Sequence, residues 1–283
     1  MYAMPRFGRG RDLFGASTAP ASGRTVLMTH SNSSRFTVMT MNVHKGLSPL
    51  HRHSTIYQLR QKMRSHHPDL LFLQELQQEH RGRVQRFGQW PLTELTHFLS
   101  EDFWHDWHYG KNVEYPDGHH GNAILSKRPL RKGNNYDISA YRFEKRGLLH
   151  SVIQLHDASP AVHCFCVHLA LFERGRERQL AEIIRYIEEL THGAPTIVAG
   201  DFNDWRNRVS APMREAGFME VFEVLTGSPA RTFPSVKPIL PMDRIYVRGL
   251  KIHSAEILHE WLKLSDHLGI SAQLRSEEHT SEL

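Results

Sequence analysis

The fold of this chain can be worked out from the stretch Thr196-Ile-Val-Ala-Gly-Asp-Phe-Asn-Asp204. An apolar run that stops at glycine predicts a buried strand, which turns at Gly200 and presents Asp201 and Asn203 outward. Open α/β sheets build their ligand sites at this edge. Gly, Asp and Asn also favour ordinary turns, so the stretch alone does not separate a site from a turn. The deciding question is whether distant residues converge on this strand end.

Length and composition indicate one large globular domain. The chain has 283 residues, of which 40% are hydrophobic and 23% charged, and it has no apolar run of 18 residues. We therefore expect no integral membrane segment. A net charge of +5 permits a phosphate-rich partner, but a charge this small also serves solubility alone. We expect a monomer.

The two cysteines indicate the compartment. Cys164 and Cys166 are two residues apart in a strand-like run, so both project from the same face in a poor geometry for a disulfide. We interpret them as buried thiols in a reducing, cytoplasmic environment. A C-x-C pair without further cysteines is also a weak zinc signal, because a closed zinc site needs four ligands.

The chain divides into a core and two tails. Residues 1–34 are rich in Arg, Gly and Ser with little hydrophobic periodicity, which predicts a disordered N-terminal extension, either a leader or part of a mis-assigned start. Residues 275–283 resemble a translated sequencing adapter, so we interpret them as an artefactual tail. Residues 35–274 remain as the folded domain.

Strand and helix patterns alternate through that domain, which predicts a single layered fold of the α/β (α+β) class. The clearest helix is 173–190, whose apolar residues share one face. Further helices are expected at 54–66, at 92–99 and near 211. Strands are expected at 36–42, 70–74, 121–126, 147–155, 161–169, 196–199 and 242–247, around 252–258, and after 267.

Polar side chains stand at the ends of most predicted strands, which favours the site interpretation over a simple turn. Carboxylates and amides without a thiolate suit a hard, oxygen-preferring ion such as Mg²⁺ or Mn²⁺. The residues in these positions are Asn42, His44, Glu75, His168, Asp201, Asn203, Asp243, Asp266 and His267.

These positions belong to seven short motifs that occur in the order found in the endonuclease/exonuclease/phosphatase (DNase I-like) superfamily. The motifs are Thr40-Met-Asn-Val-His-Lys-Gly46, Leu73-Gln-Glu-Leu76, Gly121-Asn-Ala-Ile-Leu-Ser126, Val167-His-Leu169, Gly200-Asp-Phe-Asn203, Met242-Asp-Arg-Ile-Tyr246 and Ser265-Asp-His267. The chain resembles this superfamily over about residues 36–274, and within it an uncharacterised bacterial YbhP-like branch. The resemblance implies a four-layer sandwich of two mixed β-sheets flanked by helices.

The resemblance also implies roles for the strand-end residues. Glu75 would be the principal metal ligand, with Asn42 and Asp266 beside it. Asp201 would orient and deprotonate the attacking water, and Asn203 would hold that water or a phosphate oxygen. His267, paired with Asp243, and His168 would contact the phosphoryl group. A carboxylate on one ring nitrogen favours imidazolium, which stabilises developing negative charge.

Substrate contacts are less sharply defined. The stretches Tyr115-Pro-Asp-Gly-His-His-Gly-Asn-Ala123, Glu144-Lys-Arg-Gly147 and Gly200-Asp-Phe-Asn-Asp-Trp-Arg206 also resemble the YbhP-like branch. Together with the first motif they suggest His44, His120, Asn122, Arg146 and Trp205. Several relatives have an acid where this chain has His44, so a phosphate contact is as good an interpretation as a metal ligand. Arg146 also fits an ordinary basic turn. Trp205, together with Phe233 and Trp104, could form a stacking wall, although core packing is the commoner fate of such residues.

The resemblance implies a Mg²⁺- or Mn²⁺-dependent phosphoesterase that hydrolyses a phosphodiester by in-line attack of an activated water. An alternative is a phosphatase or phospholipase-like esterase that acts on lipid headgroups or small phosphates. A second alternative is an inactive binding module, which the complete set of motif residues opposes. The partner is a phosphoester, either nucleic acid or a lipid or small phosphate, and the sequence does not choose between them.

Overall fold

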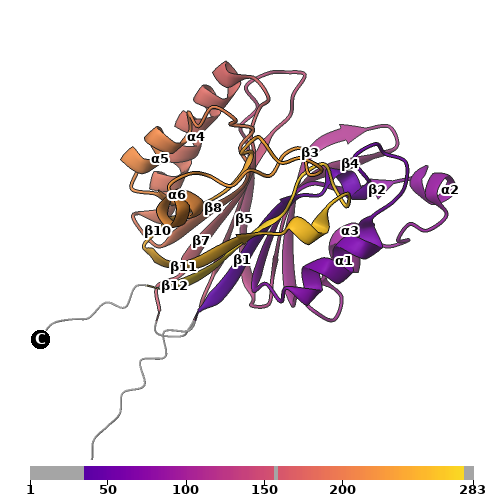
Figure 1. Ribbon diagram of the computed structural model, residues 1–283, viewed down its shortest axis with the longest axis horizontal. Helices are drawn as coiled ribbons and strands as arrows, with labels where there is room; N and C mark the ends of the chain where they lie inside the picture. The colour runs from indigo at the N-terminus through magenta and orange to yellow at the C-terminus, as the bar shows by residue number, and fades with distance from the viewer. Residues whose placement is uncertain (1–34, 156–158, 277–283) are drawn as a thin grey trace, which may run out of the picture. The chain divides into compact units, whose positions relative to one another are not determined.

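Two six-stranded mixed sheets form the centre of the computed structural model, which describes residues 35–155 and 159–276 (Figure 1). In spatial order the first sheet contains β11 (Leu250–Ile257), β12 (Ile270–Ser276), β1 (Phe36–Asn42), β2 (Leu70–His80), β4 (Gly118–Ser126) and β3 (Asp106–Tyr115). The second contains β5 (Leu130–Asp137), β6 (Gly147–Ile153), β7 (Val162–His168), β8 (Thr196–Asp201), β10 (Asp243–Arg248) and β9 (Met219–Glu220).

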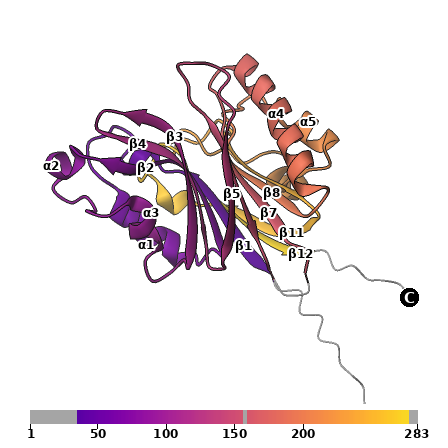
Figure 2. The ribbon, with the colours of Figure 1, turned by 180° about the vertical axis from the view of Figure 1, so that it is seen from behind.

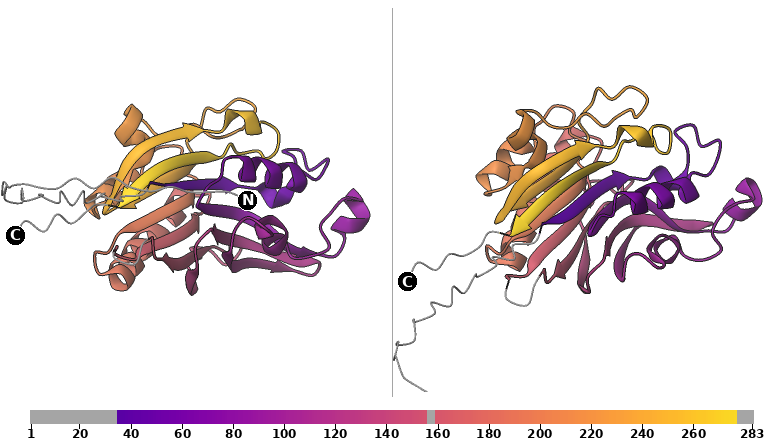
Figure 3. Two further views of the ribbon diagram at one scale, coloured as in Figure 1. Left: turned by 90° about the horizontal axis from the view of Figure 1, so that it is seen from below. Right: turned by 60° about the horizontal axis from the view of Figure 1, so that its bottom comes forward.

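Each sheet has one parallel strand pair at its centre, and its other pairs are antiparallel. In the first sheet β1 and β2 are parallel, and in the second β7 and β8 are parallel. The helix α1 (Ile56–Ser65) connects the first parallel pair, and α4 (Glu173–Thr191) connects the second. Figure 3 shows β11 and β12 in yellow beside β1 in indigo. The last strands of the domain thus pair with its first strand.

The remaining helices are short. They are α2 (Arg83–Phe87), α3 (Leu95–Ser100), α5 (Ser210–Glu215) and α6 (Val221–Thr226), with 3-10 turns η1 (His44–Gly46) and η2 (His259–Trp261). In Figures 1 and 2, α1 and α3 lie on one side of the strands and α4 and α5 on the other.

Three apolar clusters fill the spaces between these layers. The cluster between the two sheets includes Phe72, Leu149, Cys164 and Ile197, all buried. A second cluster packs the first sheet against α1 and α3, and a third packs the second sheet against α4 and α5. The predicted four-layer sandwich of two mixed sheets between helices is therefore confirmed.

Individual elements follow the predictions where burial is strong. The strand 36–42 is confirmed residue for residue, and α4 covers the helix predicted at 173–190. Strand β2 continues to His80, well past the end predicted at 74. Strands β3 and β5 were not predicted, because their side chains are largely half-buried or exposed and carry little apolar alternation.

The expected tails fall mostly outside the described residues. This applies to the N-terminal extension at 1–34 and to residues 277–283. Arg275 and Ser276 are described, and they pair with Lys251 and Leu250 as the end of β12. The ordered domain therefore extends two residues beyond the boundary expected at 274.

In the described part of the chain, every helix is too short or too polar to cross a membrane.

Candidate active site

The polar strand ends predicted from the sequence come together where the two sheets meet. Asn42 ends β1, Glu75 lies on β2, His168 ends β7 and Asp201 ends β8. Gly200 makes the approach of β7 and β8 possible. An ideal Cβ at this glycine would lie 2.0 Å from the carbonyl oxygen of Val167, and its φ is +150°.

Asp201 is the centre of the cluster, and it is almost completely buried. Its Oδ2 atom accepts a hydrogen bond from Asn42 Nδ2 at 3.1 Å, which crosses from one sheet to the other. The same oxygen lies 3.4 Å from His168 Nε2 and 3.7 Å from His267 Nε2. Its Oδ1 atom accepts from the backbone N–H of Asn203 at 2.9 Å. Four predicted residues therefore surround this one carboxylate.

The predicted pairing of Asp243 with His267 is present. Asp243 Oδ2 lies 2.8 Å from His267 Nδ1, and both side chains are buried. The same carboxylate oxygen accepts from the Thr232 hydroxyl at 2.5 Å. Thr232 and His267, which lie in different loops, thus both fix the position of the Asp243 carboxylate.

Glu75 is directed into the site by an irregularity in β2. The register between β2 and β4 shifts between Leu73 and Leu76, and Glu75 has a φ of +54° at that bulge. Bulges re-aim side chains in this way and occur often beside active sites. Its carboxylate lies 3.6 Å from Lys45 Nζ and accepts from Asn42 Nδ2 at 3.5 Å.

Asp266 lies on the same side as Glu75, and it contacts the first loop of the domain. Its Oδ1 atom is 3.1 Å from His44 Nδ1 and accepts from the Ser265 hydroxyl at 3.2 Å. Ser265 Oγ also donates to the carbonyl oxygen of Asn42 at 2.7 Å. Ser265 thereby joins the C-terminal motif to the end of β1.

Left-handed backbone conformations concentrate at this site. Positive φ in a residue with a Cβ costs energy and persists where the surrounding structure enforces it. His44, Lys45, Glu75 and Asn203 have φ between 45° and 57°. An observed concentration of strain supports a functional hypothesis for these positions.

Burial and neighbouring charges shift the pKa values in this cluster strongly. Burial opposes the charged form of His267, but Asp243 and Asp201 outweigh it and raise its pKa to about 10. Burial raises the pKa of Asp201 to about 6, although His267 pulls it down. Burial, followed by Arg146 and His267, lowers the pKa of His168 well below its usual value. At neutral pH the site therefore holds an ionised Asp201, a charged His267 and a neutral His168.

Carboxylates are numerous enough here to hold a divalent cation. Glu75, Asp201, Asp243 and Asp266 converge, and a metal ion would offset this negative charge. Ligand atoms of Asp201, Asp243 and His267 lie within 4.8 Å of one another. However, both nitrogens of His267 face carboxylates and its raised pKa keeps both protonated, so the ring has no free lone pair for a metal. Glu75 and Asp266 offer carboxylate oxygen atoms, which fit Mg²⁺ or Mn²⁺. Asn42 turns its amide N–H groups toward Glu75 and Asp201, and its Oδ1 atom accepts from the backbone N–H of His44 at 3.0 Å.

Two of the predicted substrate contacts lie next to this cluster. Burial lowers the pKa of His120 to about 4, with Lys45 and Arg146 acting in the same direction, while Glu75 opposes them. Arg146 Nε donates to the carbonyl oxygen of Leu169 at 3.1 Å, and Asn203 Nδ2 donates to the same oxygen at 3.0 Å. Both His120 and Arg146 are therefore close enough to influence the charge of the site.

Other suggested contacts have structural partners. Asn122 is fully buried, and its amide donates to the carbonyl oxygens of Gly147 and Cys166, which leaves no donor for a phosphate. Trp205 is partly exposed beneath the guanidinium of Arg176 at 4.8 Å. Trp104 belongs to the core beneath the first sheet and donates to the Pro68 carbonyl, so its suggested place in a stacking wall was wrong.

Sequence reasoning missed three residues that support the site: Lys45, Thr232 and Ser265. Lys45 and Ser265 lie inside motifs quoted above, where only their neighbours were assigned roles. Thr232 lies in the loop before β10, 11 residues from Asp243. Thr232 is the middle residue of the stretch Ala230-Arg-Thr-Phe-Pro234, which resembles the YbhP-like branch, and that position was the available signal.

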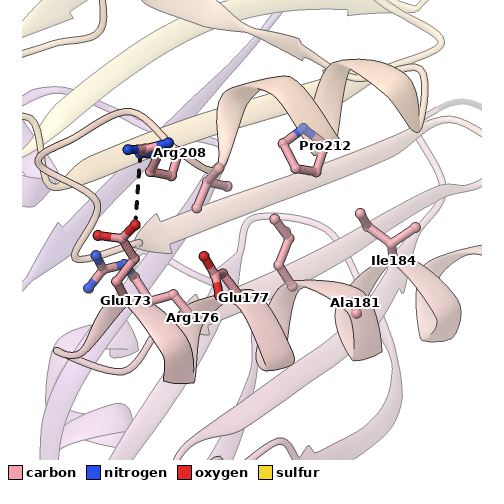
Figure 4. Close-up of a pocket in the computed structure, with 9 residues that line it drawn as sticks. Glu173, Arg176, Glu177, Ala181, Ile184, Arg208 and Pro212 are labelled. Carbon is pink, nitrogen blue, oxygen red and sulfur yellow. Dashed lines mark ion pairs between the residues drawn. The ribbon is translucent and has the colours of Figure 1, made fainter.

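A separate cavity of about 430 Å³ lies between α4 and α5, on the outer face of the second sheet (Figure 4). Its lining includes Leu180 and Ile184. An ion pair between Arg208 and Glu173, at 3.8 Å, lies at one end. None of the motif residues lines it. We therefore place the chemistry at the strand ends and not in this cavity.

The fold and the cluster together define a class of protein. The chain belongs to the Endonuclease/Exonuclease/phosphatase family, whose model matches residues 39–267. Family membership points to a phosphoester hydrolase. Among individual proteins, the chain is 41% identical over 242 residues to the uncharacterized protein YbhP of Escherichia coli (strain K12). The match covers 84% of this chain and 96% of YbhP.

Solved structures share the same fold at low sequence identity. One is the endonuclease/exonuclease/phosphatase from Beutenbergia cavernae DSM 12333, with a TM-score of 0.68, 17% identity, and coverage of 86% of this chain and 72% of that one. Another is D. rerio TDP2 complexed with single strand DNA product, with a TM-score of 0.61, 20% identity, and coverage of 85% and 99%. At these identities the likeness describes the fold alone.

Proposed function

We propose that the protein is a Mg²⁺- or Mn²⁺-dependent phosphodiesterase that hydrolyses its substrate by in-line attack of water on phosphorus. The observation that carries the proposal is the arrangement around Asp201 Oδ2. This buried, ionised oxygen faces Asn42, His168 and His267, and Glu75 lies on the other side of Asn42. The cluster thus offers a proton acceptor, hydrogen-bond donors and carboxylate ligands in one place.

The proposed metal ligands are Glu75, Asn42 and Asp266, which lie on the first-sheet side of the cluster. A divalent cation held there would supply charge stabilisation for the phosphoryl and leaving oxygens. Lys45 and His44 are the cationic or potentially cationic partners of Glu75 and Asp266 in the structure. Both acids have lowered pKa values despite burial, chiefly through Lys45 at Glu75 and through His44 at Asp266.

The residues of the second sheet would perform the proton and phosphoryl steps. Asp201 accepts the proton of the attacking water, because it is ionised and has an oxygen directed into the cluster. Asn203 orients that water or a phosphate oxygen. The charged ring of His267, held by Asp243, donates to the phosphoryl oxygens as negative charge develops. His168, which is neutral and buried, acts as a second hydrogen-bond donor through Nε2.

Residues around the cluster are proposed to contact the parts of the substrate outside the reacting phosphoryl group. His44, His120 and Arg146 border the cluster and would meet phosphate oxygens. Trp205 lies beside the Asp201–Asp204 turn and would contact the group attached to the phosphate. The amide of Asn122 instead supports the two sheets. We expect the protein to act as a cytoplasmic monomer.

The test is a substrate panel of phosphomonoesters, phosphodiesters, DNA, RNA and phospholipids, assayed with Mg²⁺ or Mn²⁺ and with EDTA. Wild type is compared with Asp201→Asn and with the control Asp102→Asn. Asp102 is an exposed carboxylate in the turn after α3 and outside the site, so the same exchange there leaves the site intact. We expect EDTA and Asp201→Asn each to abolish hydrolysis while Asp102→Asn retains it.

Each alternative gives a different result in this panel. Activity that persists in EDTA contradicts the metal mechanism. Hydrolysis confined to phosphomonoesters or small phosphates supports the phosphatase alternative. No turnover by folded wild type on any class, with either metal, supports a binding module that has lost activity.

A further inference from the structure

Six large apolar side chains protrude from the loops that border the candidate site. Phe143 is 77% exposed, Leu50 is 69% exposed and Val236 is 59% exposed. Single exposed apolar residues are ordinary, but several around one site indicate an interaction surface. We call this set the rim: Leu50, Phe143, Leu171, Phe172, Val236 and Ile239.

Contacts made by the rim residues or their sequence neighbours place the rim on different sides of the site. On the metal side, the ring of His51, next to Leu50, lies 4.2 Å from that of His44. On the His267 side, the N–H of Ser235, next to Val236, donates to the carbonyl oxygen of Asp266 at 2.7 Å. On the Asp201 side, Leu171 lies two residues after Leu169, whose carbonyl oxygen accepts from Asn203 Nδ2 at 3.0 Å. The N–H of Leu171 also donates to Glu144 at 3.0 Å.

Ordered neighbours support the most exposed member of the rim. The rings of Tyr141 and Phe143 are stacked, with centroids 5.2 Å apart and planes 12° apart, and Phe172 meets Tyr141 edge-on at 6.2 Å. Gly175 leaves room for this arrangement, because an ideal Cβ there would lie 2.6 Å from Tyr141 Cε2. Phe143 is therefore a packed ring that faces outward, and not an unsupported side chain.

Cations accompany these apolar side chains, and acids are scarce. Residues 47–55 and 228–241 contain no Asp or Glu. Arg52, Arg142, Arg174 and Lys237 are exposed on or beside the rim loops, and they form no ion pair with any residue that the structure describes. The two acids next to rim residues are held in ion pairs: Glu144 lies 3.0 Å from Arg146, and Glu173 lies 3.2 Å from Arg206. The charge around the rim thus complements an anionic partner.

We propose that the rim docks on an anionic lipid surface, with its apolar side chains entering the interface and the adjacent cations contacting lipid phosphates. Apolar side chains interspersed with Lys and Arg are the composition of interfacial membrane binding. A single-stranded nucleic acid would match the cations but would need rings on which its bases stack. Phe143 and Phe172 are the two rim residues with rings, and the other four have aliphatic side chains, which favours lipid. This proposal rests on the proposed function in one respect: docking would bring a phosphoester carried by a lipid to the site.

The test is co-sedimentation of the full chain with vesicles of phosphatidylcholine alone, or mixed with phosphatidylglycerol. The rim variant is Leu50→Ser, Phe143→Ser, Val236→Ser. The matched control is Val224→Ser, Leu225→Ser, which replaces exposed apolar residues on α6. We expect wild type and control to sediment with the mixed vesicles, and the rim variant to bind at least about tenfold less. A second variant, Arg142→Glu, Lys237→Glu, should lose the preference for phosphatidylglycerol.

Docking and catalysis are measured separately. Metal-dependent hydrolysis of a small water-soluble phosphodiester should be the same in wild type and in the rim variant. If wild type hydrolyses nothing but sediments through the rim, docking stands and the proposed function fails. If wild type ignores both vesicle types, or the rim variant binds like wild type, docking is contradicted. Loss of binding to a single-stranded oligonucleotide, with vesicle binding unchanged, would reassign the surface to nucleic acid.

Discussion

Asp243 presents the most direct test of a single residue. It holds the ring of His267 at 2.8 Å and is itself held by Thr232. In Asp243→Asn an amide replaces the charge that keeps His267 an imidazolium, so stabilisation of the developing phosphoryl charge is lost. We expect kcat to fall about 10²- to 10³-fold, the usual effect of losing one such donor. The measurement is kcat on the best substrate of the panel.

Thr232→Val provides the graded control for that experiment. It removes the Thr232 hydroxyl, which donates to the Asp243 carboxylate and accepts from the Asp243 N–H, but it leaves the charge of Asp243 and its contact with His267. We expect a loss of about tenfold, the lower end of the range for losing a hydrogen bond to a charged group, which contributes about 1.5–3 kcal/mol. Equal activity of wild type and Asp243→Asn, with both folded, would remove Asp243 and His267 from the mechanism.

Glu75 makes a prediction about metal affinity that does not depend on activity. The exchange Glu75→Gln removes the negative charge of the proposed principal ligand. We expect Mn²⁺ binding, followed by isothermal titration calorimetry, to weaken at least about tenfold. Lys45→Met is the opposite control, because it frees the Glu75 carboxylate from its ion pair and should strengthen binding. An unchanged Mn²⁺ affinity in Glu75→Gln would show that Glu75 is not the principal metal ligand.

At the residue scale, sequence motifs predicted the central group but not its supports. Asp201, Glu75 and His267 stood out because carboxylates and imidazoles at strand ends carry recognisable chemistry. Thr232 and Lys45 are ordinary residue types, and each has a role only through its partner. Thr232 contacts Asp243, 11 residues away, and Lys45 contacts Glu75, which a bulge directs into the site. Asn122 illustrates the reverse case, since its motif position did not reveal that its amide would be used between the sheets.

The close approach of β7 and β8 leads to a prediction about stability. In Gly200→Ala the new Cβ would collide with the carbonyl oxygen of Val167, 2.0 Å away. We expect a loss of at least about 3 kcal/mol in the free energy of unfolding, from backbone strain plus displacement of β7. Urea denaturation measures it.

Gly193→Ala is the matched control for that glycine. Gly193 follows α4 with φ +84°, and nothing lies within 4 Å of its ideal Cβ. The substitution there should cost only about 1 kcal/mol, the backbone term alone. Equal losses at the two glycines would show that the strand contact is not what requires Gly200.

A pair of buried histidines between β6 and β7 predicts a pH dependence of stability. His150 Nε2 lies 3.0 Å from His163 Nδ1, and the His150 ring also stacks on Phe165. Burial lowers the pKa of His150 to about 4, and the neighbouring His163, Arg131 and His108 act in the same direction. Burial lowers the pKa of His163 as well.

The unfolded chain therefore takes up protons at these histidines before the folded protein does. The contribution of His150 to stability is complete above the unfolded pKa of about 6.5, and it is lost as pH falls through about 4. The lowered pKa of His163 acts in the same direction. The urea midpoint of wild type should fall between pH 7 and pH 5. The double variant His150→Phe, His163→Phe should show a smaller fall. An identical pH dependence in both proteins would contradict the assignment.

Elements were predictable where burial imposed a clear period. Strand β1 and helix α4 bury one continuous run and one continuous face, and the sequence shows both patterns. Strand β3 is mostly half-buried and β5 is mostly exposed, so neither needed an apolar pattern. They form through pairing with β4 and β6, which are buried. That information resides in the partner strands, and it is absent from the segments themselves.

For the whole molecule, the two cysteines report on the integrity of the space between the sheets. Both are fully buried there, and burial raises the pKa of Cys166 to about 12 and that of Cys164 still further from its usual value. We expect no reaction of native protein with a thiol reagent at pH 8, and two labels per chain in guanidinium chloride. Mass spectrometry counts the labels, and rapid labelling of native protein would contradict this packing.

The overall architecture was predicted through family resemblance and not through strand patterns. A series of alternating strands and helices is compatible with one large sheet as well as with two packed sheets. What separates them is which strands pair at the edges, for example β11 and β12 beside β1. That pairing joins the last strands of the domain to its first, a long-range contact that local sequence does not encode.

The two sheets share a pattern that bears on the history of the site. Both have six strands with a single parallel pair in the third and fourth positions, and in both a helix connects that pair. Asn42 and His168 end the first strand of each pair, and Glu75 and Asp201 lie on the second. Duplication of one ancestral βαβ unit would leave this arrangement. On that view the counterpart of Asp201 is Gln74, because Asn42 pairs with Gln74 and His168 pairs with Asp201. Glu75 lies one residue further along, at the β2 bulge. The proposed metal ligand and the proposed proton acceptor would therefore have arisen at different positions of the repeated unit.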